Sequence, residues 1–158
     1  MRALLLAFLC LSSGIAAARA TLYVRLGGES GVAAIANSLI DRTAADPVAG
    51  RSFEGSNLKR IKRLLAEQLC AMSGGPCRYT GDSMREVHAG LHISEAEFYR
   101  MVDILRGILH ERDIDQRSEN ELLAMLAPMK RDVVEHARAA RAADAPVDTL
   151  IENPGTRP

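Results

Sequence analysis

The chain has 158 residues, of which 20 are Lys or Arg and 20 are Asp or Glu, so its formal net charge is zero. That balance argues against a nucleic-acid-binding protein, which normally carries an excess or a stripe of basic residues. Hydrophobic residues make up 47% of the sequence and aromatic residues only 4%, so Leu, Ile, Val, Met and Ala must build the core of an ordinary globular domain. This choice of residues favours helices over a β-sandwich.

The first twenty residues predict a secretory signal peptide. Arg2 precedes an unbroken apolar run from Ala3 to Leu11, and Ala18 and Ala20 are small residues at the spacing that a signal peptidase requires. The apolar run is much shorter than the ~20 residues that a membrane-spanning helix needs. We therefore expect cleavage after Ala20, export to the periplasm, and a mature chain that has no membrane partner.

The rest of the chain predicts helices, because apolar residues recur at helical spacing and no convincing strand follows residue 20. Five apolar stripes follow one another: Val32, Ile35 and Leu39; Leu58, Ile61, Leu65, Leu69 and Met72; Met84, Val87, His88 and Leu91; Phe98, Met101, Val102, Leu105, Ile108 and Leu109; Leu122, Met125, Leu126, Met129 and Val133. Pro128 should kink the last of them. We expect one all-α domain over residues 21–138 and a disordered tail over residues 139–158, where no apolar stripe continues.

Capping signals predict where several of these helices begin. Ser94–Glu97 and Ser118–Glu121 both fit the capping box, in which the serine side chain accepts a backbone amide and the glutamate accepts the amide of that serine. Either Asp82 or Ser83 can cap the helix of the third stripe.

Two cysteines, Cys70 and Cys77, remain after the predicted cleavage. Cys70 lies near the end of the second stripe and Cys77 follows the turn Gly74–Pro76, so the chain can reverse between them. An oxidising compartment permits a disulfide here. The alternative is a pair of small, partly buried thiols.

His88 is the candidate metal ligand, because it lies on the apolar face of a short helix between Met84 and Leu91. No HExxH or CxxC spacing supports a zinc site. A single histidine on an apolar face is most often a hydrogen-bonded core residue. A haem iron, however, needs one imidazole on a hydrophobic wall.

Five motifs in order along the chain resemble the group I truncated haemoglobins. They are Leu22–Gly28, Phe53–Leu58, Gly74–Gly81, Met84–Leu91 and Leu126–Met129. The resemblance runs through nearly the whole mature chain. It implies an all-α, two-over-two helical sandwich around b-type haem, and a protein that binds oxygen, nitric oxide or carbon monoxide.

The family pattern carries over to individual residues of this sequence. It implies His88 as the proximal iron ligand and Phe53 as the ring that packs against the haem plane. It implies apolar haem contacts at Leu58, Ile61, Met84, Val87, Ile93, Phe98 and Met101. Arg85 would lie near the haem propionates or else be an ordinary surface residue, and Tyr79 matches a loop tyrosine with a structural role.

The side of the expected pocket opposite His88 departs from the family pattern. Many members place a tyrosine where Ile40 stands and polar residues where Ile61 and Leu65 stand. The nearest polar candidates are Gln68, one turn further along, and Lys62, one residue off the face. A hydrogen-bond donor to the charged outer atom of bound oxygen is worth about 1–3 kcal/mol. Without such a donor, we expect the pocket to show little preference for oxygen. The same positions also offer no evident acid–base residue for peroxidase chemistry.

The function predicted from the sequence is therefore a monomeric haem protein that reversibly binds diatomic gases. Carrier roles such as oxygen transport, sensor roles and scavenger roles fit equally well, and the sequence does not identify an electron donor. One alternative is a haem-dependent nitric oxide dioxygenase or another redox enzyme. The other is a helical interaction module without haem, which the absence of a Soret band would reveal.

Overall fold

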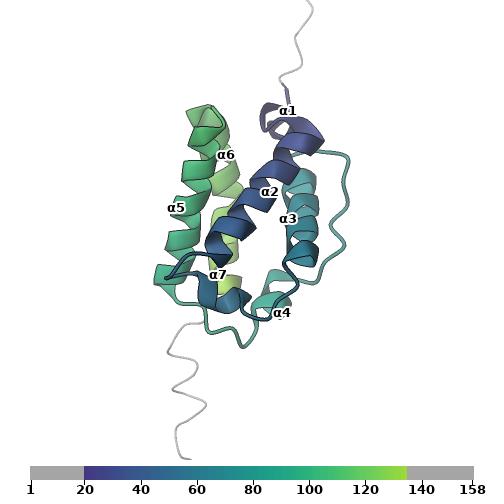
Figure 1. The fold of residues 1–158 in the computed structure, drawn as a ribbon. Coiled ribbons are helices and arrows are strands. Elements are labelled where there is room, and N and C mark those ends of the chain that lie inside the picture. Colours follow the sequence, from purple (N-terminus) through teal and green to yellow (C-terminus); the bar gives the residue numbers. More distant parts are fainter. Residues whose placement is uncertain (1–19, 135–158) are drawn as a thin grey trace, which may run out of the picture.

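The computed structural model describes residues 20–134, which form α-helices and short 3-10 helices and contain no strand (Figure 1). The predicted leader, apart from Ala20, and the predicted tail at residues 139–158 lie outside the described residues. The elements are α1 (Leu22–Arg25), α2 (Gly28–Ala44), η1 (Gly50–Phe53), α3 (Leu58–Met72), α4 (Met84–His88), α5 (Glu95–Glu111), α6 (Gln116–Leu126), η2 (Ala127–Met129) and α7 (Lys130–Val133). The all-α prediction is confirmed.

Helix α2 lies at the centre of the fold. It packs most extensively against α3 and next against α5, and in Figure 1 it crosses between α3 on one side and the pair α5 and α6 on the other. Apolar side chains that recur at helical spacing face one another here and form the core, whose buried members are Leu22, Leu26, Val32, Ile35, Ala36, Leu39, Leu69, Cys70, Leu105, Ile108, Leu109 and Leu122. None of the helices in residues 20–134 combines the length and the apolar character that a membrane crossing requires.

Two of the predicted helix starts are confirmed as capping boxes. The Ser94 hydroxyl accepts the Glu97 amide at 3.2 Å, and the Glu97 carboxylate accepts the Ser94 amide at 2.8 Å. Ser83, not Asp82, caps α4 in the same way with Glu86.

The predicted start at Ser118 is wrong. Helix α6 begins earlier, because Asp115 offers a stronger acceptor: its carboxylate accepts both the Ser118 amide at 3.0 Å and the Ser118 hydroxyl at 2.6 Å. Ser118 is therefore buried inside the first turn. At the other end, α6 stops at Leu126 and Pro128 lies in η2, so the proline interrupts the fifth stripe as predicted.

Candidate functional site

A cavity of about 580 Å³ opens between α2, α3, α4 and α5, with further walls from η1, η2 and α7. Most of its lining is aliphatic or aromatic. It lies beside the core rather than inside it, because α4 does not pack broadly against α2 or α3 and leaves a space on that side.

His88 lies on the α4 wall of this cavity and is half-buried. Its Nδ1 is 2.7 Å from the carbonyl oxygen of Met84, one helical turn earlier. A carbonyl oxygen only accepts hydrogen bonds, so Nδ1 carries the proton in this contact and Nε2 keeps its lone pair. Histidines that bind metals through one nitrogen commonly donate the other N–H in this way. His88 is therefore prepared to act as a metal ligand.

The walls that α2 and α3 contribute are apolar at the positions that the sequence singled out. Ile40 of α2 and Ile61 and Leu65 of α3 all line the cavity. Thr43 lines it too, but its hydroxyl donates to the Leu39 carbonyl at 2.7 Å and is already used.

The two polar candidates near this wall point elsewhere. The Gln68 side-chain amide lies 3.5 Å from the sulfurs of both Met84 and Met129, so it lines the cavity on the side of α4 and η2. Lys62 does not line the cavity, and its ammonium group pairs with Asp41 at 2.5 Å. Neither residue supplies a donor beside Ile40.

Most of the predicted haem-contacting residues do line the cavity. They are Phe53, Ile61, Met84, Val87, His88, Ile93, Phe98 and Met101. Leu58 and Arg85 do not. Arg85 is 79% exposed and pairs with Asp132 of α7 at 2.8 Å, because its position on α4 falls outside the face shared by Met84 and His88. Of the two interpretations that the sequence left open for Arg85, its exposure and its absence from the lining favour an ordinary surface residue.

Two polar residues that sequence reasoning missed also line the cavity. The Ser52 hydroxyl is buried and has no hydrogen-bond partner among residues 20–134. Arg60, in the first turn of α3, is exposed and reaches the cavity as well. Neither stands in a motif, and a serine in a turn or an arginine on a helix normally reads as a solvated surface residue.

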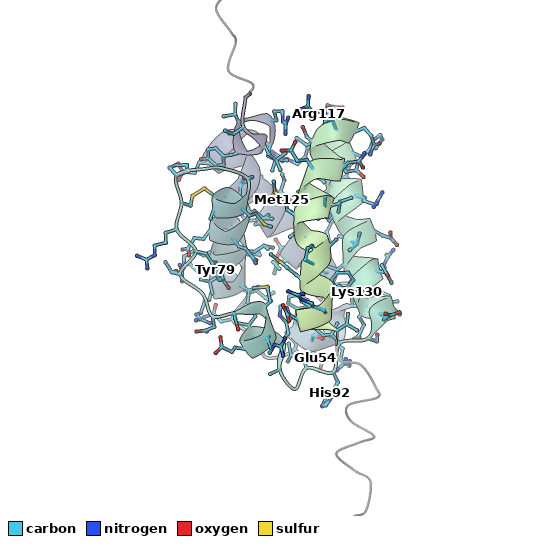
Figure 2. The ribbon with its side chains drawn as sticks, turned by 180° about the vertical axis from the view of Figure 1, so that it is seen from behind. Glu54, Tyr79, His92, Arg117, Met125 and Lys130 are labelled. Carbon is cyan, nitrogen blue, oxygen red and sulfur yellow. A yellow bond between two sulfur atoms is a disulfide. The ribbon has the colours of Figure 1, made fainter. Side chains whose placement is uncertain are left out.

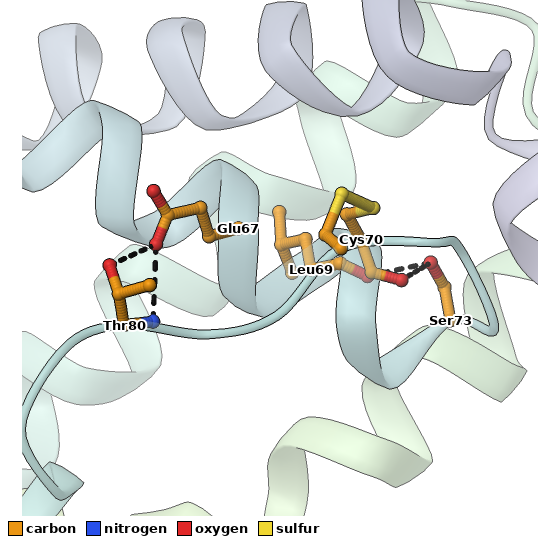
Figure 3. Close-up of a disulfide and its surroundings, with 6 residues drawn as sticks. Glu67, Leu69, Cys70, Ser73 and Thr80 are labelled. Carbon is orange, nitrogen blue, oxygen red and sulfur yellow. Dashed lines mark hydrogen bonds between the residues drawn. A yellow bond between two sulfur atoms is a disulfide. The ribbon is translucent and has the colours of Figure 1, made fainter.

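The loop that leads into α4 is fastened to α3 at two points (Figure 3). Of the two states that the sequence left open for Cys70 and Cys77, the structure has the disulfide. Three residues further on, the Thr80 hydroxyl and amide donate to the Glu67 carboxylate at 2.6 and 3.2 Å. The hydrogen bond from the Thr80 hydroxyl has the largest effect on the pKa of Glu67. Together with the bond from the Thr80 amide it outweighs the effect of burial and holds this pKa below its ordinary value. The loop thus fixes where α4 begins.

The segment that follows α4 is fastened by Arg51 of η1. Its guanidinium donates to the carbonyl oxygens of Leu91 and His92 at 3.2 Å, and to the Glu97 carboxylate at 2.9 Å. Figure 2 shows His92 at the outer edge of the molecule, and this residue does not line the cavity. Among residues 20–134, His88 is thus the histidine that lines the cavity.

Residues 20–134 contain no group of three or more His, Cys, Asp or Glu side chains that could hold a metal ion by themselves. His88 alone offers one ligand. A metal bound here would therefore have to bring most of its own ligands, as an iron inside a macrocycle does.

Comparison with known proteins gives one consistent result. A family model described as bacterial-like globin matches residues 21–135. The group 1 truncated hemoglobin GlbN of Mycolicibacterium paratuberculosis is 29% identical over 114 residues, which cover 72% of this chain and 84% of that protein. The group 1 truncated hemoglobin of Tetrahymena pyriformis is 24% identical over 114 residues, covering 72% and 94%.

Solved structures agree in fold. The truncated hemoglobin of Tetrahymena pyriformis in its Fe(III) form superposes with a TM-score of 0.70 at 23% identity, covering 74% of this chain and 100% of that one. The 2/2 hemoglobin of a Synechococcus species, in the cyanomet state and with covalently attached heme, gives 0.69 at 24% identity with the same coverage. The two-over-two helical architecture expected from the sequence is therefore confirmed.

Proposed function

The chain belongs to the bacterial-like globin family, and we propose that it holds haem iron through His88 in a pocket that gives oxygen little advantage over other diatomic gases. As a globin it is a haem protein that binds diatomic gases. The observation that carries the proposal is the pairing of one prepared imidazole, His88, with an opposite wall made of Ile40, Ile61 and Leu65.

The chemistry of the described residues fits haem. The cavity is apolar, and the His88 Nδ1–H is directed to the Met84 carbonyl, which leaves Nε2 for iron. The apolar faces of the macrocycle would lie against Phe53, Ile61, Met84, Val87, Ile93, Phe98 and Met101, all of which line the cavity. Bound there, the iron supplies an open coordination position for a small gas molecule.

The wall formed by Ile40, Ile61 and Leu65 sets the gas preference. None of these side chains can donate a hydrogen bond, and none can ligate iron. Oxygen gains more charge on binding than carbon monoxide or nitric oxide, so it loses most when a donor worth about 1–3 kcal/mol is absent. Each 1.4 kcal/mol changes an affinity about tenfold. Oxygen should therefore leave this pocket quickly while carbon monoxide stays.

Spectroscopy and stopped-flow kinetics test this proposal directly. The purified protein should show a strong Soret band, and its unliganded ferrous form should be five-coordinate. Oxygen release should be fast in the unmodified protein and unchanged in Gln68→Leu and Ser52→Ala, which remove the two side chains best able to donate from elsewhere on the lining. Slow release that becomes fast in either variant would contradict the apolar-pocket proposal and identify the real donor.

The enzymatic alternative has no observation in its favour. Nitric oxide dioxygenation starts from bound oxygen, and none of Ile40, Ile61 and Leu65 can donate a hydrogen bond that stabilises it. Peroxidase-type chemistry needs a proton donor or acceptor near the bound ligand, and Gln68 lies between two methionine sulfurs instead. A haem-free interaction module is not supported either, because family membership and an imidazole aimed into an apolar cavity both favour haem.

Export to the periplasm is a second part of the proposal. It is supported by the apolar leader from Ala3 to Leu11 and by the Cys70–Cys77 disulfide, since such bonds persist in oxidising compartments. N-terminal sequencing of protein from a periplasmic extract should begin at Thr21. Recovery of the full-length chain from the cytoplasm would contradict it.

A further inference from the structure

Haem brings two carboxylates with it, and these propionate groups need cationic partners at the edge of an apolar cavity. Among residues 20–134 that line this cavity, Arg60 is the single Arg or Lys. It is exposed and lies in the first turn of α3, so it occupies the rim rather than the interior.

The guanidinium of Arg60 is free to bind. Its backbone amide donates to the Asn57 side chain at 3.0 Å, which caps α3, but within residues 20–134 no hydrogen bond or ion pair involves its side chain. Four other cations of η1, α3 and α4 are already paired. Lys62 pairs with Asp41, Arg63 with Glu67, and Arg51 with Glu97; Arg85, on the other wall, pairs with Asp132.

The residues around Arg60 show which part of the cavity rim it occupies. Tyr79 and Asp82 also line the cavity, and the Tyr79 hydroxyl donates to the Asp82 carbonyl at 2.8 Å. Burial and the Asp82 carboxylate raise the pKa of Tyr79, while the positive charge of Arg60 acts in the opposite direction. One rim of the cavity therefore carries one free cation, Arg60, and one carboxylate, Asp82. Arg60 attracts an incoming anion and Asp82 repels it.

We propose that Arg60 binds a haem carboxylate at this rim, and that Arg85 does not. The proposal rests on haem binding by this cavity, because the ligand it assigns to Arg60 is part of haem. A planar guanidinium can engage a carboxylate with two parallel hydrogen bonds. Asp82, at the same rim, weakens that attraction.

The test measures transfer of haem from the protein to an excess of haem-free myoglobin, with ordinary haem and with its dimethyl ester. The ester keeps the iron and the macrocycle but has no carboxylates. With ordinary haem, Arg60→Gln should lose the cofactor about two- to fivefold faster, the range for an exposed ion pair. With the ester, Arg60→Gln and the unmodified protein should lose it at the same rate.

Two matched variants sharpen this result. Arg85→Gln removes an equivalent charge from α4 together with its tie to Asp132, so it should change the loss of ordinary haem and of the ester by the same factor. Asp82→Asn removes the opposing charge while keeping the carbonyl that Tyr79 uses, and it should slow the loss of ordinary haem but not of the ester.

Three outcomes distinguish a wrong carboxylate assignment from a failure of haem binding itself. If Arg60→Gln accelerates loss of haem and of the ester equally, Arg60 acts on the fold and the carboxylate assignment is wrong. If Arg85→Gln reproduces the effect with ordinary haem alone, the carboxylates lie at the α4 rim instead. If the unmodified protein takes up neither cofactor, haem binding itself fails.

Discussion

The two walls of the cavity are built in opposite ways. Helix α2, which carries Ile40, is 17 residues long and has seven buried residues: Gly31, Val32, Ile35, Ala36, Leu39, Ile40 and Thr43. Helix α4, which carries His88, is five residues long and has none. The α2–α3 wall is thus part of the core, whereas the α4 wall stands apart from it.

The α4 wall depends on attachments at its ends. The disulfide Cys70–Cys77 and the hydrogen bonds from Thr80 to Glu67 fix the chain before it. Arg51 holds the chain after it, and Arg85 ties the helix itself to Asp132. Segments with few buried apolar contacts open at low free-energy cost. The wall that carries His88, the proposed iron ligand, is therefore expected to depend most on the cofactor and on these attachments for its order.

Replacing His88 tests the α4 wall most severely. His88→Ala removes the imidazole that the Met84 carbonyl orients, so haem content should fall sharply and any remaining Soret spectrum should lose its imidazole-ligated form. His92→Ala is the matched control, because His92 is the next histidine along but lies at the outer edge of the molecule. An unchanged spectrum in His88→Ala would contradict the assignment.

Removing the disulfide should loosen the same wall. Cys70→Ala combined with Cys77→Ala opens a loop with a sequence separation of 7, which should lower the free energy of unfolding by up to roughly 2–3 kcal/mol in the chain-entropy model. Urea unfolding monitored by circular dichroism measures this, and haem transfer should also be faster. Dithiothreitol should reproduce both effects in the unmodified protein and do nothing to the double variant. An oxidised protein that shows two alkylatable thiols by mass spectrometry would contradict the disulfide.

A hydrogen-bond donor placed on the α2–α3 wall should change the kinetics of gas release without loosening α4. Ile40 is 2% exposed and lines the cavity, so Ile40→Tyr can direct its hydroxyl inwards. One hydrogen bond to bound oxygen should slow its release by about tenfold. Ile40→Phe keeps the ring and lacks the hydroxyl, so it should leave release fast. Equal slowing in both variants would mean that bulk, not hydrogen bonding, controls the rate.

The smallest expected effect is a change in how the stability of the protein depends on pH. The pKa of Glu67 lies below its ordinary value of 4.5, chiefly because the Thr80 hydroxyl donates to it. A carboxylate whose pKa is lowered by folding stabilises the protein at pH values above its ordinary pKa. That contribution disappears as the pH falls through the pKa of the folded state. Glu67→Gln should therefore be less stable than the unmodified protein at pH 7, and the difference should shrink below about pH 4.5. Urea midpoints across this range measure it; a constant difference would contradict the mechanism.

The sequence by itself determined the features that depend on near neighbours along the chain. Apolar spacing located the helices, and a serine three residues before a glutamate placed the start of α5, because both partners of a capping box lie within one turn. For α4 the sequence left Asp82 and Ser83 open, and the structure selects Ser83. The same rule failed at Ser118, where Asp115 supplies a better acceptor to the same amide. His88 stood out because its helical face is readable from the residues one turn away.

Tertiary structure decided the features that depend on distant partners. Arg85 and Arg60 look alike in the sequence, but Arg85 meets Asp132, 47 residues further on, while Arg60 reaches the cavity with its charge unpaired. The Ser52 hydroxyl is likewise buried in the tertiary structure, where η1 packs against α2. Helical periodicity fixes which side of its own helix a residue occupies; the packing of the helices decides what that side faces.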